Sequence, residues 1–291
     1  MHREDPHRRL AESVGEVLRE TGLRNEECIA LLDRLPSKWE RFSDVVLLPN
    51  SAFQGKWDLH VSEELWRAVA EALKVNRLAK LGEISGEMRE SSVEMLLGED
   101  DWVVRRENGV DYGYNLTQCM FSAGNVNERR RMGEVTGAGE VVVDLYAGIG
   151  YYSLPMLVHS QVDHIHCCEW NPNAVRALES NLKSNGVTGR CTVHFGDNRV
   201  TAANLEGVAD RIILGLLPSA EDGYALAMAA LRPAGGVLHV HGVAASGNHV
   251  AWAADVTEAL RERGRGFAVD AVEALRVKSY APHWDHVVLD V

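Results

Sequence analysis

The 291-residue sequence predicts an α/β fold in which a doubly wound parallel sheet follows a small α+β region. Two observations support this fold class. From residue 140 onward, short apolar runs alternate with stretches of helical spacing, which is the pattern of β-α-β units. The first run, Val141–Val143, ends in Asp144 and leads into a turn that contains Gly148 and Gly150. This order is typical of Rossmann-like nucleotide-binding domains, because glycine lets the backbone bend sharply and approach a ligand closely.

The region before residue 120 has both helical and strand patterns. Apolar residues recur at helical spacing as far as Pro36, with a break at Gly22. Ser62 is a natural N-cap for the helix that follows it, and Glu107-Asn108-Gly109 is typical of a hairpin turn. The expected elements are helical segments on both sides of Gly22, a strand at 45–49, a helix at 62–73 and strands within 91–116.

After residue 140 the predicted order is strand, helix, strand, helix. The expected strands are 140–145, 163–168, 190–194, 210–216, 236–242, 268–277 and 285–290. The expected helices are 150–160, 172–185, 222–231 and 251–263. The last two strands are too close together for a helical crossover, so we expect them to pair antiparallel. An antiparallel final strand is the layout of class I methyltransferase-like domains, and not of the dehydrogenases that share the glycine turn.

The patterns divide the chain into three expected parts. These are a helical N-terminal extension over 1–34, a small α+β accessory domain over 35–120 and a Rossmann-like cofactor-binding domain over 121–291. At 46% hydrophobic residues the chain can supply a substantial core. It has no run of 18 apolar residues and no signal-like start, so we expect a cytoplasmic protein that does not contact a membrane.

Cysteines and charge restrict the function further. The five cysteines form no C-x-x-C pair, which indicates reduced structural thiols. A net charge of −12 argues against a nonspecific nucleic-acid binder, because that function needs clustered cations that face phosphates. Arg105-Arg106 and Arg129-Arg130-Arg131 are local basic clusters, and a solvated face is the plain interpretation of such runs.

Acidic residues follow three successive predicted strands. Asp144 follows the first, Glu169 comes about 25 residues later, and Asp197 follows the third. Ligands of α/β sheets bind at the carboxyl ends of parallel strands, where an acid in the position of Glu169 meets a ribose diol. Asp197 is a candidate acceptor for an adenine amino group, with Asn198 as a second polar contact. The sequence therefore predicts a cofactor that contains adenosine, whose reactive end lies beside the loop 214–219.

Several segments resemble the tRNA wybutosine-synthesising protein 2 family. They are Asp144–Tyr151, Cys168–Pro172, His194–Arg199, Leu214–Ser219, Val277–His283 and, upstream, Cys119–Arg129. The resemblance extends from about Leu35 to Val291, and several of the motifs are specific to this family. A neighbouring family, the tRNA guanine-37 N1-methyltransferases, shares the fold and the cofactor.

The resemblance implies a tRNA-modifying transferase of wybutosine biosynthesis. Such an enzyme moves the 3-amino-3-carboxypropyl group of S-adenosylmethionine to C7 of 4-demethylwyosine at position 37, in the anticodon loop of tRNA-Phe, and releases 5′-methylthioadenosine. The accessory domain is then a candidate tRNA contact. The residues that the resemblance places at the cofactor are Ser122, Arg129, Glu169, Asp197 and Asn198, together with the turn that contains Asp144, Ala147, Gly148 and Gly150.

Two neighbouring residues are candidates for catalysis. The sulfonium has three carbons open to displacement, so the group transferred depends on which carbon is held in line with the nucleophile. Arg129 is a candidate clamp for the carboxylate of the aminocarboxypropyl arm, and a solvated helix arginine is the alternative. Glu128 is a candidate acceptor for the proton lost from C7, and a helix-capping glutamate is the alternative.

The sequence leaves two alternatives to this function and argues against a metal site. The methyltransferase family typically carries an Asn in the loop that corresponds to 214–219, and this chain has Gly215-Leu216-Leu217-Pro218, which favours aminocarboxypropyl transfer. A non-catalytic S-adenosylmethionine-binding or RNA-binding module is the second alternative. We expect no metal, because His239-x-His241 and His283-x-x-His286 lack a matching set of carboxylates or cysteines.

Overall fold

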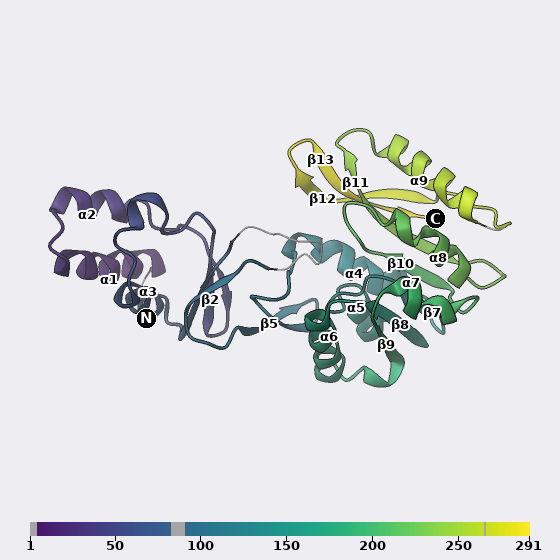
Figure 1. The fold of residues 1–291 in the computed structure, drawn as a ribbon, viewed down its shortest axis with the longest axis horizontal. Coiled ribbons are helices and arrows are strands. Elements are labelled where there is room, and N and C mark those ends of the chain that lie inside the picture. The colour runs from purple at the N-terminus through teal and green to yellow at the C-terminus, as the bar shows by residue number, and fades with distance from the viewer. Residues whose placement is uncertain (1–4, 83–90, 265) are drawn as a thin grey trace. The chain divides into compact units, whose positions relative to one another are not determined.

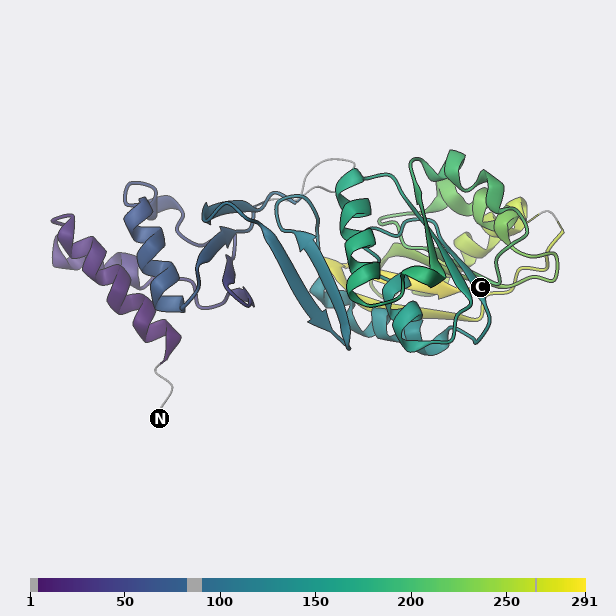
Figure 2. The same ribbon diagram turned by 90° about the horizontal axis from the view of Figure 1, so that it is seen from below.

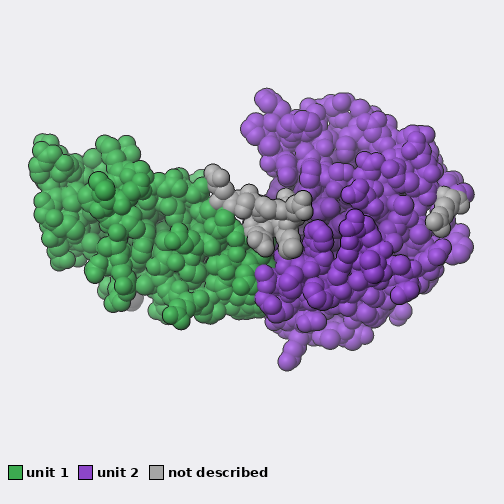
Figure 3. Space-filling model, viewed as in Figure 1, with its two compact units in different colours: residues 1–105, 114–120 green, residues 106–113, 121–291 purple. Residues whose placement is uncertain are grey.

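The computed structural model describes residues 5–82, 91–264 and 266–291 (Figures 1 and 2). The chain divides into two compact units (Figure 3). Unit 1 contains Met1–Arg105 and Tyr114–Met120, and unit 2 contains Arg106–Gly113 and Phe121–Val291. The predicted three-part division at residues 34 and 120 stays a prediction.

The described residues of unit 1 (5–82, 91–105 and 114–120) form three helices and a four-stranded sheet of order β1-β2-β3-β4. The helices are α1 (Pro6–Glu20), α2 (Asn25–Leu32) and α3 (Glu63–Leu73), and the strands are β1 (Glu40–Phe42), β2 (Val45–Leu48), β3 (Arg77–Lys80) and β4 (Glu94–Leu97). Ser62 caps α3 as expected, since its hydroxyl accepts a hydrogen bond of 3.2 Å from the Leu65 amide.

The first helix of unit 1 shares its core with the sheet and with α3. Leu10 and Val14 of α1 are buried in one cluster with Val46 of β2 and with Leu65 and Val69 of α3. Burial of these side chains is the main term that stabilises a small unit of this kind. The helical segment before residue 34 is therefore packed into the same unit as the strands and helix that follow it.

The hairpin β5 (Trp102–Glu107) and β6 (Val110–Asn115) forms a separate two-stranded sheet. Asn108 and Gly109 both have positive φ, of 50° and 79°. A type I′ turn needs positive φ at both central positions, and the Asn-Gly pair supplies it. The predicted hairpin is thus confirmed, and its tip, residues 106–113, belongs to unit 2.

Unit 2 contains a seven-stranded sheet of order β12-β13-β11-β10-β7-β8-β9. Its strands are β7 (Val141–Asp144), β8 (His164–Glu169), β9 (Cys191–Phe195), β10 (Arg211–Leu214), β11 (Val237–Ala245), β12 (Glu273–Ala281) and β13 (Trp284–Asp290). The strands β7 to β11 pair in parallel, and β13 pairs antiparallel with both β11 and β12. The doubly wound sheet with an antiparallel last strand, expected for a class I methyltransferase-like domain, is confirmed.

Helices cover both faces of this sheet (Figure 1). They are α4 (Val126–Val135), α5 (Ser153–His159), α6 (Pro172–Ser184), α7 (Asn198–Thr201), α8 (Tyr224–Ala230) and α9 (His249–Arg263). Short 3-10 helices are η1 (Gly55–Trp57) in unit 1 and, in unit 2, η2 (Ala123–Asn125), η3 (Thr188–Arg190), η4 (Ala203–Leu205) and η5 (Glu221–Gly223). Side chains of α8 and α9 share a core cluster with Val143 and Ile212 of the central strands. The chain runs from β7 outward through β8 and β9 and returns to β10, so β7 and β10 flank the topological switch point where such sheets bind ligands.

Three features differ from the expected elements. The short strands β1 and β3 were not expected, because Glu40–Phe42 and Arg77–Lys80 carry charged residues and are too brief to give a periodic signal. The strand β12 begins at Glu273, five residues later than expected, although Val269 is already buried in the core.

Within the described part of the chain, no helix has the length and apolar character that crossing a membrane requires.

Candidate active site

The glycine turn connects β7 to α5 at the switch point. Gly148 and Gly150 have φ of +57° and +97°, in the left-handed region that favours glycine. A Cβ on Gly150 would lie 2.7 Å from Leu154 Cγ and 2.9 Å from Leu178 Cδ1, so there is no space for a side chain. The predicted sharp turn is therefore present, and Ala147 is buried within it.

Glu169, the last residue of β8, fixes this turn from the neighbouring strand. One carboxylate oxygen accepts a 2.7 Å hydrogen bond from the Gly148 amide, and the other accepts from the amides of Trp170 and Asn171 at 3.0 and 2.8 Å. Burial raises the pKa of Glu169, and these backbone donors oppose that rise. The carboxylate is held in place at the strand edge where the sequence placed a ribose contact.

Asp144 is fully buried beneath the turn. Its carboxylate accepts a 2.6 Å hydrogen bond from the Ser153 hydroxyl and a 3.3 Å bond from the Tyr146 amide. Burial raises the pKa of Asp144 to about 6. Direct contact between Asp144 and a ligand, which the sequence suggested, does not fit a side chain with 0% exposure. Asp144 instead holds the start of α5 against the turn.

Asp197 and Asn198 lie at the end of β9, as expected. Asn198 donates a 2.8 Å hydrogen bond to the carbonyl of Leu145, which ties this loop to the residue after β7. Asp197 caps α7 and accepts from Arg199, whose guanidinium lowers the pKa of that carboxyl. Glu169 and Asp197 thus end adjacent parallel strands, and their adenosine contacts stay predictions.

Asn181 of α6 is a positioning residue that the sequence did not reveal. Its amide nitrogen donates to the Ile149 carbonyl in the glycine turn at 3.1 Å, and its oxygen accepts from the Gly113 amide at the hairpin tip at 2.6 Å. Asn181 is 1% exposed. Its position in the last turn of the amphipathic helix α6 carries no local signal, because the partners come from distant segments.

Arg129 of α4 is buried, with 1% of its surface exposed, and protein groups surround its guanidinium. Its guanidinium pairs bidentately with Glu107 of the hairpin at 2.6 and 2.7 Å and donates to the Ser122 carbonyl at 3.0 Å. It also stacks over the Phe121 ring, 4.5 Å from the centroid. The carboxylate clamp expected for Arg129 stays a prediction, and these contacts indicate that Arg129 shapes the Ser122 segment.

Glu128 is similarly engaged. Both of its oxygens accept from Arg131, at 2.8 and 2.9 Å, and Arg131 also pairs with Asp290 of β13 at 2.6 Å. Glu128 is 5% exposed. A general base needs a free lone pair that faces the substrate. The proton-acceptor role stays a prediction for Glu128, and the triad indicates a contact that joins α4 to β13.

The two arginine clusters do not form basic faces. Arg105 pairs with Glu40, Arg106 with Asp111, and Arg130 with Glu134, while Arg129 and Arg131 are held as described above. The expectation of a solvated cationic face was therefore wrong for Arg129, which is buried, and for Arg131, whose side chain is 20% exposed. Their partners Glu107 and Asp290 lie on other elements, so the sequence alone could not identify these two pairs.

Tyr152 follows the glycine turn and is the N-cap residue of α5. Its ring stacks on His241 with centroids 4.7 Å apart, and the His241 Nδ1 lies 3.0 Å from the Nε2 of His286. Burial raises the pKa of the Tyr152 hydroxyl, and a hydrogen bond with the side chain of Asn125 opposes that rise. Gly215, after β10, packs against this ring, since a Cβ there would lie 3.1 Å from Tyr152 Cε2.

The histidines that suggested a metal are paired with other groups. His239 Nδ1 lies 2.6 Å from Asp290, and its Nε2 lies 2.6 Å from Arg211. Over residues 5–82, 91–264 and 266–291, no group of three or more His, Cys, Asp or Glu has an arrangement that could hold a metal ion. His283 is exposed in the β12–β13 turn.

A second histidine cluster gives a pH prediction. His166 of β8 lies 3.0 Å from His194 of β9 and beside His164, and burial together with these neighbours lowers the pKa of His166 to about 4. Between pH 6.5 and 4, His166 binds a proton in the unfolded chain but stays neutral in the folded chain. The stability contributed by neutral His166 is therefore complete above pH 6.5 and is lost as the pH falls toward 4.

We expect His166→Gln to flatten this acid-dependent loss. Thermal denaturation at pH 8 and pH 5 should give a fall in Tm that is smaller in the variant by about 2–4 °C. His7→Gln, which changes an exposed histidine of α1, serves as the control and should retain the wild-type pH dependence. Equal falls in Tm for His166→Gln and wild type would contradict the prediction.

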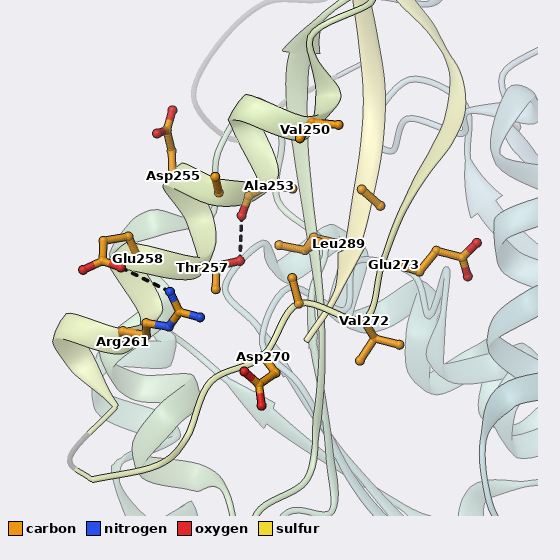
Figure 4. A pocket seen from close by; sticks show the side chains of 13 residues that line it. Val250, Ala253, Asp255, Thr257, Glu258, Arg261, Asp270, Val272, Glu273 and Leu289 are labelled. Atoms are coloured by element: carbon orange, nitrogen blue, oxygen red, sulfur yellow. Dashed lines mark hydrogen bonds and ion pairs between the residues drawn. The ribbon is translucent and has the colours of Figure 1, made fainter.

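A surface groove lies between α9 and β12, away from the switch point (Figure 4). Val250 and Ala253 of α9, Val272 and Leu289 contribute apolar surface to it. Glu273, at the start of β12, is paired with Asp290 of β13, and Asp290 is in turn paired with His239 near the start of β11. The groove therefore lies toward the amino ends of the parallel strands, opposite the edge that carries Glu169.

The strand order and the glycine turn define a class I methyltransferase-fold domain, and the fixed carboxylate of Glu169 lies at its switch point. Two family models match the chain, a TRM5/TYW2 methyltransferase domain over residues 103–264 and a TYW2 N-terminal domain over residues 16–101. The chain belongs to the tRNA wybutosine-synthesizing protein 2 family, as the sequence motifs indicated.

Individual relatives support this assignment. A tRNA wybutosine-synthesizing protein 2 homolog of Danio rerio is 38% identical over 98% of this chain and 78% of its own length. The tRNA wybutosine-synthesizing protein 2/3/4 of Arabidopsis thaliana is 44% identical over 98% of this chain, which spans only 29% of that relative. The structure of P. horikoshii TYW2 in complex with MeSAdo matches with a TM-score of 0.77 and 29% identity, over 96% of this chain and 97% of that chain.

Proposed function

We propose that the chain is an S-adenosylmethionine-dependent tRNA-modifying transferase. It moves the 3-amino-3-carboxypropyl group to C7 of 4-demethylwyosine at position 37 of tRNA-Phe, in wybutosine biosynthesis. The observation that carries the proposal is the Glu169 carboxylate fixed at the switch point, in a chain that both family models match along most of its length. A solved structure supports the proposal. The structure of M. jannaschii TYW2 in complex with AdoMet matches this chain with 26% identity and a TM-score of 0.68.

The residues at the strand ends fit an adenosine-containing co-substrate. Glu169 uses three backbone donors of the roughly four that a carboxylate can accept, which leaves capacity for a ribose hydroxyl. Asp197 and Asn198 at the next strand end supply polar groups for the adenine. Gly148 and Gly150 keep the turn free of side chains.

The chemistry of the transfer is a displacement at carbon. S-Adenosylmethionine supplies a sulfonium whose bond to the γ-carbon of the aminocarboxypropyl group breaks as a carbon–carbon bond forms to C7. Methylthioadenosine leaves with the electron pair of the broken bond, and C7 loses a proton. What this chain adds is positioning, because the group transferred depends on which of the three sulfonium carbons is held in line with C7.

The loop after β10 supports aminocarboxypropyl transfer over methylation. Its residues Gly215-Leu216-Leu217-Pro218 carry no side-chain amide that could hold a guanine edge. Gly215 instead packs on the ring of Tyr152. The anticodon-loop position of the substrate is part of this proposal and rests on the names of the relatives.

The products of the reaction test the proposal. The purified protein is incubated with hypomodified tRNA-Phe and S-adenosylmethionine labelled either in the carboxyl carbon or in the methyl carbon. We expect methylthioadenosine as product and carboxyl label in the tRNA. S-Adenosylhomocysteine with methyl label in the tRNA would overturn the proposal in favour of methylation. A tRNA-Phe with unmodified guanosine at position 37 is the control substrate and should take up neither label.

A further inference from the structure

The hairpin formed by β12 and β13 carries two exposed aromatic side chains at its tip. Trp284, the first residue of β13, is 48% exposed, and Tyr280, near the end of β12, is 42% exposed. The pairing register of the two strands shifts at Tyr280, and such bulges often re-aim a side chain next to an active site. Tryptophan is on average highly buried in folded proteins, so an exposed pair of aromatic residues at one tip indicates contact with another molecule.

This tip lies at the carboxyl edge of the parallel strands, where the candidate site is. The strand β11 extends beyond the end of β10 as far as Ala245, which is paired with Trp284. Within this extension, the Val243 amide donates a 3.0 Å hydrogen bond to the Pro218 carbonyl. The loop 214–219 therefore runs along the same extension of the sheet that carries the aromatic tip.

Trp284 also lies on the face of the sheet that the candidate site uses. Side chains alternate between the two faces of a strand, so Trp284 shares its face with His286. The ring of His286 lies 5.2 Å from that of His241, which stacks on Tyr152. The intervening Asp285 faces the other way and pairs with a histidine of α9. A row of rings thus leads from Tyr152, after the glycine turn, toward the exposed Trp284.

The strand that leads into the tip is locally cationic. Residues 274–284 contain Arg276 and Lys278 and no acidic residue, in a chain with a net charge of −12. Lys278 is paired across the strands with His286, so its ammonium group lies on the face of Trp284. Flat aromatic rings beside a cation suit a ligand that combines flat rings with negative charge, which is the chemistry of single-stranded RNA.

We propose that Trp284 and Tyr280 form a stacking surface for unpaired bases of the tRNA anticodon loop. This inference rests on the proposed function and adds to it a contact with bases other than the target. Proteins commonly hold splayed bases of RNA loops by stacking them on aromatic side chains. A neighbouring base stacked on this tip fixes the loop at the carboxyl edge of the sheet, where the target base meets the co-substrate.

Binding of labelled, hypomodified tRNA-Phe, measured by fluorescence anisotropy, tests the inference. We expect Trp284→Leu and Tyr280→Leu each to weaken this binding by about 10-fold, because leucine keeps apolar surface but cannot stack on a base. Trp284→Phe keeps a ring and should stay within about threefold of wild type. Calorimetry should show that all three variants bind S-adenosylmethionine within about twofold of wild type, since the tip lies beyond the glycine turn and Glu169.

Synthetic anticodon stem-loops that each lack one loop base make the test specific to stacking. At least one of them should bind wild type about 10-fold more weakly than the intact stem-loop does. The same RNA should bind Trp284→Leu as well as the intact stem-loop does, because the contact is already lost. Independent losses at every position of the loop would contradict stacking on Trp284.

The matched control is Val272→Ala, which removes an exposed apolar side chain just before β12, at the opposite edge of the sheet. It should bind tRNA-Phe as wild type does, and far-UV circular dichroism checks that every variant is folded. Unchanged tRNA binding in Trp284→Leu, or equal weakening in Trp284→Phe and Trp284→Leu, would overturn the inference and leave the proposed function standing. If the wild-type protein itself fails to bind tRNA-Phe, the proposed function fails first.

Discussion

Replacing Arg129 by methionine is expected to lower the free energy of unfolding by about 3–5 kcal/mol. The substitution leaves the Glu107 carboxylate, which is 11% exposed, as a buried charge without its bidentate partner. It also removes the donor to the Ser122 carbonyl and the cation over the Phe121 ring. Urea denaturation followed by far-UV circular dichroism measures the change in unfolding free energy.

The neighbouring arginine provides the matched control. Arg130 lies on the same helix at 58% exposure and pairs with the equally exposed Glu134. Arg130→Met should change the unfolding free energy by no more than about 0.5 kcal/mol. The double variant Arg129→Met/Glu107→Leu should recover much of the loss, because it leaves no buried charge unpaired. A loss in Arg129→Met no larger than that in Arg130→Met would contradict the assignment.

Replacing Glu169 by glutamine is expected to weaken binding of S-adenosylmethionine by about 100-fold. Both carboxylate oxygens accept hydrogen bonds from backbone N–H groups. In the variant, the NH2 group of the glutamine must therefore face a backbone N–H, and both groups are donors. Losing a hydrogen bond to a charged acceptor costs about 1.5–3 kcal/mol, and the Gly148 turn loses its anchor at the same time. Titration calorimetry with S-adenosylmethionine and with methylthioadenosine measures the affinities.

Both ligands should weaken together in this variant, because Glu169 lies at the proposed adenosine end that they share. Glu179→Gln, an exposed carboxylate on α6, makes the same chemical change away from the turn and should leave both affinities unaltered. Wild-type affinities in Glu169→Gln would show that neither the carboxylate nor its hold on Gly148 matters for the ligand.

The fold of unit 2 was predictable because its signals are local. The strands β7 and β10 are almost entirely buried, and their apolar residues therefore appear as short runs in the sequence. Their order follows from the strong preference of β-α-β units for one hand and short connections. In unit 1, β1 and β3 are three and four residues long and partly charged, so they became strands only through pairing with β2.

The candidate site was predictable only where a residue's position follows from its strand. Glu169, Asp197 and the two glycines lie where the strand ends place them. The contacts of Arg129 and Arg131 depended on partners that lie far away in the sequence, since Glu107 is 22 residues from Arg129 and Asp290 is 159 residues from Arg131. Local patterns cannot identify such partners, and for this reason Asn181 was also missed.

The hairpin tip restricts where this protein can be cut or fused during evolution without the loss of a buried contact. Because residues 106–113 belong to unit 2, the partner of Arg129 precedes the segment 114–120 that returns to unit 1. A fragment that starts at residue 121 would lack Glu107 and carry an unpaired buried guanidinium. The module that a gene fusion can transfer intact therefore begins ahead of the hairpin, which agrees with the junction of the two family models between residues 101 and 103. Unit 1 cannot be exchanged at residue 120 without taking residues 106–113 of unit 2 with it.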